Sequence, residues 1–214
     1  MKKILFRLLM ALGAFILILV INYVVINIIS TKVTEGTPIH TSGSGQTALL
    51  VIDVQEGTTG VTSTTESYQK QSDGLIRNLN QMVKEARDKN WTVVYIQSEI
   101  ANPLINILNN SMARGSVGAM LDKRLDVKSD LIVTKRRSDS FSHTNLDQIL
   151  EENQVEKLVV VGLDAAHCVK STIQAALNRG YEVAVIPDGI IAGEEAVKER
   201  MMGEFRDMGV EFIE

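Results

Sequence analysis

The sequence predicts an α/β fold: a doubly wound three-layer α/β/α sandwich with a mostly parallel six-stranded sheet, preceded by an N-terminal transmembrane helix. From residue 47 onward, short β-branched apolar segments alternate with segments of helical periodicity. This alternation is typical of parallel strands that helices cover on both faces. Before them, residues 8–29 are apolar apart from Gly13, Asn22 and Asn27, a run long enough for a helix to cross a bilayer.

The charges divide unevenly between these two parts. The 214 residues include 22 Lys and Arg against 26 Asp and Glu, a net charge of −4. Lys2, Lys3 and Arg7 give residues 1–29 a net charge of +3, so the remaining 185 residues carry −7. Ordinary apolar content after the first segment excludes disorder, and one cysteine excludes a disulfide-stapled scaffold. Because the acidic part has no basic stripe, no nucleic-acid partner is expected.

Residues 8–29 are expected to be a retained single-pass anchor in the cell membrane. The apolar part of a signal peptide is usually about 7–15 residues, whereas this run has 22 and no A-x-A site follows it. Cleavage near residues 28–30, which would release a secreted protein, is the alternative. Positive charge before the span predicts a cytoplasmic N-terminus and an extracytoplasmic domain. Segment 30–46, rich in Gly, Ser and Thr, is expected to be a flexible linker.

Each element of the domain over residues 47–214 follows from its own pattern. Continuous apolar runs predict strands at 47–53, 91–98, 131–135, 157–162 and 181–188, with a final edge strand at 210–213. Apolar residues three or four apart predict helices around 75–86 and 146–150. A further helix over about 168–178 is closed by Gly180. The last helix is expected over 194–208.

Three ionisable residues lie where predicted strands end. Asp53 ends the first strand, Lys135 ends the third, and Cys168 follows the fourth by a few residues. Ligands of doubly wound sheets bind at the carboxyl ends of the strands. A charged group at the end of a buried strand also needs a partner. We therefore expect these three side chains to meet at one edge of the sheet.

This set of residue types suits nucleophilic catalysis. A helix N-terminus and a nearby ammonium lower the pKa of a thiol. Asp53 could accept the thiol proton and deliver it to a leaving amine, while Lys135 holds the carboxylate and stabilises the thiolate. Backbone N–H groups of the turn 164–168, at Asp164 and Cys168, could receive an oxyanion. Taken singly, each side chain could instead be structural: a core thiol, a turn cap and a solvated cation.

Three motifs carry these residues in order: ALLVIDVQ with Asp53, KRRSDSFSHTNLDQIL with Lys135, and VVVGLDAAHC with Cys168. Together they resemble the isochorismatase-like cysteine hydrolases, the superfamily that includes nicotinamidases and N-carbamoylsarcosine amidase. The similarity covers about residues 47–214. It implies a six-stranded parallel sheet, an Asp-Lys-Cys triad and a cis peptide before the nucleophile loop. Oligomers are common among such proteins, which makes a homo-oligomer a possible assembly.

The chain departs from the family pattern in ways that bear on its chemistry. Ala165 stands where a threonine is frequent, and EGTTG follows Gln55 in place of an Asn-Asp-Phe-like stretch. Nicotinamidases hold a metal through an Asp and closely spaced histidines after the second strand, where this chain has QSEIANPL. Its histidines, His40, His143 and His167, lack ligand spacing. We expect no metal and no other cofactor.

Four more residues are expected near the substrate. Gln55 could orient it or satisfy backbone groups, and Glu99 could meet an amine or amide group or lie on the loop surface. Phe141 is expected to form a pocket wall, given its place after the strand that carries the lysine. His167 is adjacent to Cys168.

The sequence thus predicts a membrane-tethered cysteine hydrolase that cleaves a C–N bond of a small amide or carbamoyl compound through a thioester. Its expected partners are that substrate and, through residues 8–29, a membrane. Because isochorismatases proper lack the cysteine, Cys168 speaks against vinyl-ether hydrolysis. Two alternatives stay open. One is a catalytically silent, membrane-anchored binding module, which the altered loop GLDAAHC favours; the other is a redox-sensing thiol, for which no resolving cysteine is present in the chain.

Overall fold

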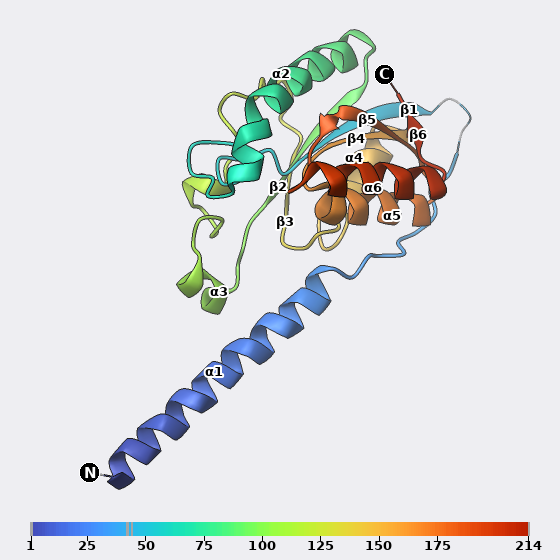
Figure 1. Ribbon diagram of the computed structural model, residues 1–214. Coiled ribbons are helices and arrows are strands. Elements are labelled where there is room, and N and C mark those ends of the chain that lie inside the picture. Colours follow the sequence, from blue (N-terminus) through green and yellow to red (C-terminus); the bar gives the residue numbers. More distant parts are fainter. Residues whose placement is uncertain (1, 42, 44, 214) are drawn as a thin grey trace.

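Six parallel strands form the sheet at the centre of the domain (Figure 1). The computed structural model describes residues 2–41, 43 and 45–213. The strands are β1 (Gln46–Ile52), β2 (Thr92–Ser98), β3 (Ile132–Lys135), β4 (Val155–Gly162), β5 (Glu182–Ile190) and β6 (Glu211–Phe212). Their order in the sheet is β3-β2-β1-β4-β5-β6, and every neighbouring pair is parallel. The predicted α/β class and strand number are confirmed.

Helices cover both faces of this sheet, giving the predicted three layers (Figure 1). Successive side chains of a strand point to opposite faces, so β1 contributes to both cores. Leu49 and Val51 pack on the side of α2, whereas Leu50 and Ile52 pack on the side of the other three helices. The helices are α2 (Glu66–Asp88) on one face, and α4 (Leu146–Glu152), α5 (Lys170–Asn178) and α6 (Glu195–Asp207) on the opposite face.

The helix expected over 168–178 begins later than its pattern suggested. Ala165–Val169 form a π-helical turn, η2, and the α-helix α5 starts only at Lys170. Cys168 therefore lies inside the π turn and not in the first turn of an α-helix. π-helical turns are rare and frequently occur at functional sites.

The region between β2 and β3 contains two short helices that the periodicity did not reveal. They are α3 (Pro103–Leu108) and the 3₁₀ turn η1 (Val117–Ala119). Asn102 caps α3, since its side chain accepts hydrogen bonds from the N–H groups of Leu104 and Ile105. Proline at the first helical position adds to this start signal. The helix is only six residues long, too short for an apolar repeat to identify it.

The N-terminal helix α1 (Lys2–Ser30) extends away from the domain as one long segment (Figure 1). Its most apolar part has a mean hydropathy of 2.8, and none of that window is buried inside the protein. An all-round apolar helix that the domain touches only near its C-terminal end is unlike the core helix of a soluble domain. The helix is a candidate membrane span or signal sequence.

Part of the predicted linker lies against the domain. Thr34 donates its backbone N–H and its hydroxyl to Oδ2 of Asp139, at 2.9 and 2.7 Å. The N–H of Ile39 donates to the carbonyl oxygen of Arg179 at 2.8 Å, and Val33 and Ile39 pack against the core. These contacts do not fit a linker that is flexible throughout residues 30–46. The polar composition of the segment does not reveal them, because the partners lie far away in the sequence.

Candidate active site

The structure brings the three residues from the strand ends into direct contact. Nζ of Lys135 lies 2.9 Å from Oδ2 of Asp53 and 3.1 Å from Sγ of Cys168. β1 and β4 are neighbours at the point where the strand order reverses, the place where open α/β sheets bind ligands. β3 lies two strands from β1, and the long Lys135 side chain bridges that distance. Lys135 is only 1% exposed, so its ammonium depends on these partners.

Ser98, which the sequence analysis missed, completes this cluster. Its hydroxyl accepts a hydrogen bond from Nζ of Lys135 at 2.8 Å and donates one to Oδ1 of Asp53 at 2.9 Å. A hydroxyl can donate and accept at once, which suits a position between a cation and a carboxylate. The available signal was its place at the end of β2, the strand between those that carry Asp53 and Lys135.

Two unusual backbone positions shape the meeting point of β1 and β4. Asp53 has a φ of 55°, in the left-handed region that non-glycine residues rarely adopt. Its N–H donates to the carbonyl of Ile96 at 2.8 Å, and its carbonyl accepts from the hydroxyl of Thr58 at 2.6 Å. Gly162 has a φ of 116°, and a Cβ there would collide with the carbonyl oxygen of Ile52. Only glycine fits this close approach of the two strands.

The nucleophile loop begins with a cis peptide between Leu163 and Asp164, as the family resemblance implies. The Asp164 carboxylate then joins three segments of the fold. Oδ1 accepts from the N–H of Ala166 at 2.8 Å, while Oδ2 accepts from the Tyr68 hydroxyl at 3.0 Å and from the N–H of Gly193 at 2.8 Å. Tyr68 on α2 was another residue that the sequence analysis missed. Its hydroxyl helps to fix the loop that carries Cys168.

The electrostatics of the site favour a protonated thiol in the resting state. Burial and the negative charge of Asp53 raise the pKa of Cys168 to about 12, against the weaker opposing effect of Lys135. Burial alone would lower the pKa of Lys135, but the negative charge of Asp53 is the first of the causes that raise it overall. The site therefore does not support the expected lowering of the thiol pKa, because burial and the nearby Asp53 carboxylate both favour the protonated thiol.

Gln55 is a structural residue at this site. It is fully buried, and its Nε2 donates to the carbonyl oxygens of Ser98 and Ala119 at 2.9 and 2.7 Å. Its Oε1 accepts from the N–H of Ser98 at 2.8 Å. Of the two roles considered for Gln55, these contacts support the satisfaction of backbone groups and not the orientation of a substrate.

Phe141 is a core residue and not the pocket wall that the sequence suggested. It is 3% exposed and belongs to the core on the side of α4, α5 and α6. Its ring stacks on Tyr181 with centroids 6.1 Å apart, and the Arg179 guanidinium lies 4.2 Å above it. A position in a loop after a strand does not fix the direction in which a side chain points.

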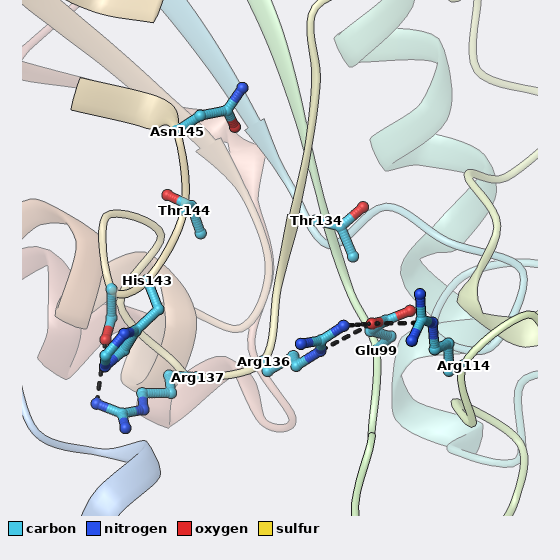
Figure 2. Close-up of a pocket in the computed structure, with 9 residues that line it drawn as sticks. Glu99, Arg114, Thr134, Arg136, Arg137, His143, Thr144 and Asn145 are labelled. Atoms are coloured by element: carbon cyan, nitrogen blue, oxygen red, sulfur yellow. Dashed lines mark hydrogen bonds and ion pairs between the residues drawn. The ribbon is translucent and has the colours of Figure 1, made fainter. Parts of the chain in front are cut away.

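The other two predicted pocket residues differ in their surroundings. The side chain of His167 is exposed, next to the half-buried Cys168. Glu99 lines a polar cavity of about 810 Å³ together with Arg114, Arg136 and His143 (Figure 2). Oε1 of Glu99 accepts from Nε and Nη2 of Arg136 at 2.8 and 2.6 Å. Its carboxylate therefore already has a cationic partner.

The donor set does not fit a metal site of the nicotinamidase kind. Within residues 2–41, 43 and 45–213, no three His, Cys, Asp or Glu side chains are grouped to hold a metal ion. β2 ends at Ser98, whose hydroxyl is engaged by Lys135 and Asp53. His143 and His167 lie in separate segments, one after β3 and the other in η2.

Fold and site together define a class of protein: an α/β protein of the hydrolase type, with a thiol, a carboxylate and an ammonium at the carboxyl edge of a parallel sheet. The chain belongs to the isochorismatase family, since the model of the isochorismatase domain matches residues 47–214. The resemblance found in the motifs is thereby confirmed.

Individual relatives agree with this assignment. The chain is 29% identical over 147 residues to the isochorismatase family protein YrdC of Bacillus subtilis, covering 68% of this chain and 73% of the relative. It is 26% identical to a probable inactive nicotinamidase of Arabidopsis thaliana, over 77% of this chain and 90% of the relative. The solved structure of N-carbamoylsarcosine amidase from Thermoplasma acidophilum matches with a TM-score of 0.65 and 26% identity, covering 78% and 95% of the two chains.

Proposed function

We propose that this protein is a cysteine amidohydrolase that cleaves the C–N bond of a small amide or carbamoyl compound through a thioester on Cys168. The observation that carries the proposal is the contact of the Lys135 ammonium with both the Asp53 carboxylate and the Cys168 sulfur. Membership of the isochorismatase family supports hydrolysis. Similarity to N-carbamoylsarcosine amidase supports an amide or carbamoyl substrate.

In the first half of the reaction, Sγ of Cys168 attacks the carbonyl carbon while Asp53 accepts the thiol proton. Because burial and Asp53 raise the pKa of the thiol, proton transfer is expected to accompany the attack. The backbone N–H groups of Asp164 and Cys168 receive the negative charge on the carbonyl oxygen. Collapse of the intermediate breaks the C–N bond, and the amine leaves with the proton from Asp53.

In the second half, water hydrolyses the thioester. Asp53 accepts a proton from the water as its oxygen attacks the acyl carbon, and the C–S bond then breaks. The thiolate leaves and regains the proton from Asp53, while the acid is released. Lys135 remains charged throughout, since its raised pKa keeps the ammonium protonated, and it stabilises both the carboxylate and the transient thiolate.

The mechanism is tested by a hydrolysis screen with the full-length protein. Wild type, Cys168→Ala and Cys168→Ser are compared on a panel of primary amides and N-carbamoyl compounds. We expect both variants to lose at least about 1,000-fold in kcat/KM, as removal of a catalytic nucleophile does elsewhere. Mass spectrometry should detect an acyl adduct on wild-type Cys168. Unchanged hydrolysis by Cys168→Ala would contradict the mechanism.

We also propose that α1 is a retained anchor that places the domain outside the cytoplasm. The length and apolar surface of α1 support a span, and Lys2, Lys3 and Arg7 precede its apolar residues 8–29. A reporter enzyme that works only outside the cytoplasm should be active when it is fused after residue 214. Activity of a reporter that works only in the cytoplasm, fused at the same position, would show that the domain lies in the cytoplasm. A mature chain that lacks residues 1–29 would identify a cleaved signal sequence instead.

A catalytically silent binding module is the second candidate function. The similarity to a probable inactive nicotinamidase and the raised pKa of Cys168 favour it. The same panel separates the two functions. Amides that raise the melting temperature of wild type, yet are recovered intact without an acyl adduct, would support the silent module.

A further inference from the structure

Two cavities adjoin the loop after β3, and both are lined by Glu99, Arg136 and Arg137. The larger, about 810 Å³, is the polar cavity of Figure 2. The smaller, about 370 Å³, lies between α1 and α3. Its apolar lining comes from Ile26, Ile29, Ile100 and Ile105. A polar and an apolar cavity that share a pair of arginines form a site suited to an amphiphile.

The polar cavity carries an excess of positive charge. Arg114, Arg136 and Arg137 line it against the single carboxylate of Glu99. Figure 2 shows Arg136 and Arg114 directed toward Glu99, whereas Arg137 approaches His143 and bonds to the neutral hydroxyl of Ser142 at 3.3 Å. This local excess lies in a part of the chain whose net charge is −7. The forked donors of arginine match the oxygens of a phosphate group.

The arginines also lie at the level where α1 ends. The carbonyl oxygen of Ser30, the last residue of α1, accepts a hydrogen bond from the N–H of Ser138 at 2.9 Å. A helix over residues 8–29 is roughly 33 Å long, close to the thickness of the hydrocarbon core of a bilayer. The end of such a span lies at the depth of the lipid phosphates. Arg136 and Arg137 would then face headgroups.

We propose that the two cavities together bind a phospholipid of the membrane that α1 spans. Arg136 and Arg137, with Arg114 nearby, hold the phosphate, and the apolar cavity between α1 and α3 receives the first part of an acyl chain. The site rests on the membrane placement proposed above and is independent of the amide chemistry. Because Arg136 directly follows Lys135, a bound lipid also fixes the catalytic edge relative to the membrane surface.

The test measures lipid binding by the full-length protein in detergent micelles. Calorimetric titrations use dihexanoyl phosphatidylglycerol, dihexanoylglycerol and inorganic phosphate as three separate probes. The arginine variant is Arg136→Gln with Arg137→Gln. The matched control is Arg77→Gln with Arg87→Gln, which removes two exposed arginines from α2 on the other side of the domain. Phosphatidylglycerol should bind wild type and the control within twofold, and the arginine variant at least tenfold more weakly.

A second variant acts in the opposite direction. Glu99→Gln removes the carboxylate that competes for Arg136, so it should bind phosphatidylglycerol severalfold more tightly than wild type. This gain cannot come from a folding defect. Dihexanoylglycerol, which lacks the phosphate, should bind at least tenfold more weakly than phosphatidylglycerol.

Two results would overturn the lipid site. Equal affinities of wild type and the arginine variant would show that these side chains do not hold the phosphate. Inorganic phosphate that binds as tightly as phosphatidylglycerol would identify a free anion as the occupant. Cys168→Ala should keep full lipid affinity, so failure of the proposed hydrolysis and failure of this site are distinguishable.

Discussion

At the scale of single residues, Ser98 determines how the proposed catalytic groups face one another. Its hydroxyl connects Lys135 and Asp53, and in the proposed mechanism it acts on the reaction only through these two residues. Ser98 is therefore a positioning residue. Ser98→Ala should lower kcat/KM about tenfold and the free energy of unfolding by about 1–3 kcal/mol, because two buried charged groups each lose a hydrogen bond.

The readouts for Ser98→Ala are steady-state kinetics across a pH series and urea denaturation. Ser98→Thr keeps the hydroxyl and should restore most of the activity. Thr134→Ala is a matched control, since it removes an exposed hydroxyl from the neighbouring strand β3. A Ser98→Ala enzyme with the wild-type pH profile and wild-type kcat would show that the hydroxyl has no positioning role.

Tyr68 tests the importance of the nucleophile loop. Tyr68→Phe removes the hydroxyl that donates to Asp164, and a buried carboxylate that loses a donor costs about 1–3 kcal/mol. We expect lower stability together with a severalfold fall in kcat. Tyr95→Phe also removes a buried tyrosine hydroxyl, one that donates to the carbonyl of Asp126, and it should leave kcat unchanged. Equal effects of the two substitutions on kcat would argue against a specific role of Tyr68.

The sequence identified Asp53, Lys135 and Cys168 because each follows a recognisable strand. It did not identify Ser98 or Tyr68, because their roles arise from side chains that meet across long separations, 45 residues for Ser98 and Asp53 and 96 for Tyr68 and Asp164. Phe141 was misplaced for the same reason. The direction of a side chain in a loop depends on tertiary packing that no local pattern contains.

At the scale of elements, the contact between β1 and β4 depends on Gly162. Gly162→Ala adds a methyl group that collides with the backbone of Ile52 at a positive φ. Such backbone strain alone costs of order 1–3 kcal/mol, so we expect a loss of at least about 3 kcal/mol and poor soluble yield. Thermal unfolding followed by circular dichroism measures this change.

Gly203 in α6 is the matched control for Gly162. An added Cβ there meets nothing within 4 Å, and alanine favours a helix interior by about 0.8–1 kcal/mol over glycine. Gly203→Ala should therefore be neutral or slightly stabilising. A Gly162→Ala protein as stable as wild type would contradict the packing described for β1 and β4.

The elements of regular pattern were predictable, and the irregular ones were not. Buried parallel strands have continuous β-branched runs, which located the central strands, and apolar segments located the less buried β3 and β6 as well. The start of α5 was misjudged because residues 165–169 have the composition of a helix yet adopt a π-helical turn around Asp164. The contacts of the linker with Asp139 and Arg179 leave no signal in its own composition. Its composition alone therefore predicted a flexible segment.

At the scale of the whole molecule, stability should fall at alkaline pH. Burial and Asp53 raise the pKa of Cys168 to about 12, and burial is the main cause that raises the pKa of Tyr181 to about 12. The pKa of Lys135 is raised too. A group with a raised pKa in the folded state binds its proton more tightly there than when unfolded. Its contribution is complete below the unfolded pKa and is lost as pH rises toward the folded value.

We therefore expect the free energy of unfolding to fall between pH 9 and pH 11, with about 1–2 kcal/mol of the loss due to Cys168. Urea denaturation at pH 8, 9, 10 and 11 measures this profile. Cys168→Ala should show a shallower decline, since one of the contributing groups is gone. A wild-type profile that is flat up to pH 11 would contradict the raised pKa values.

The bonded segment around Thr34 and Ile39 has a consequence for how the protein explores its surroundings. A long flexible linker would let the catalytic edge occupy many positions and orientations. A segment that is hydrogen-bonded to the domain leaves only a short connection between α1 and the domain. If α1 spans a membrane, as proposed, the site of Cys168 then stays at a short, fixed distance from that membrane, and substrates reach it by diffusion. The rate at which a substrate encounters the site should consequently depend on how strongly that substrate accumulates at the membrane surface.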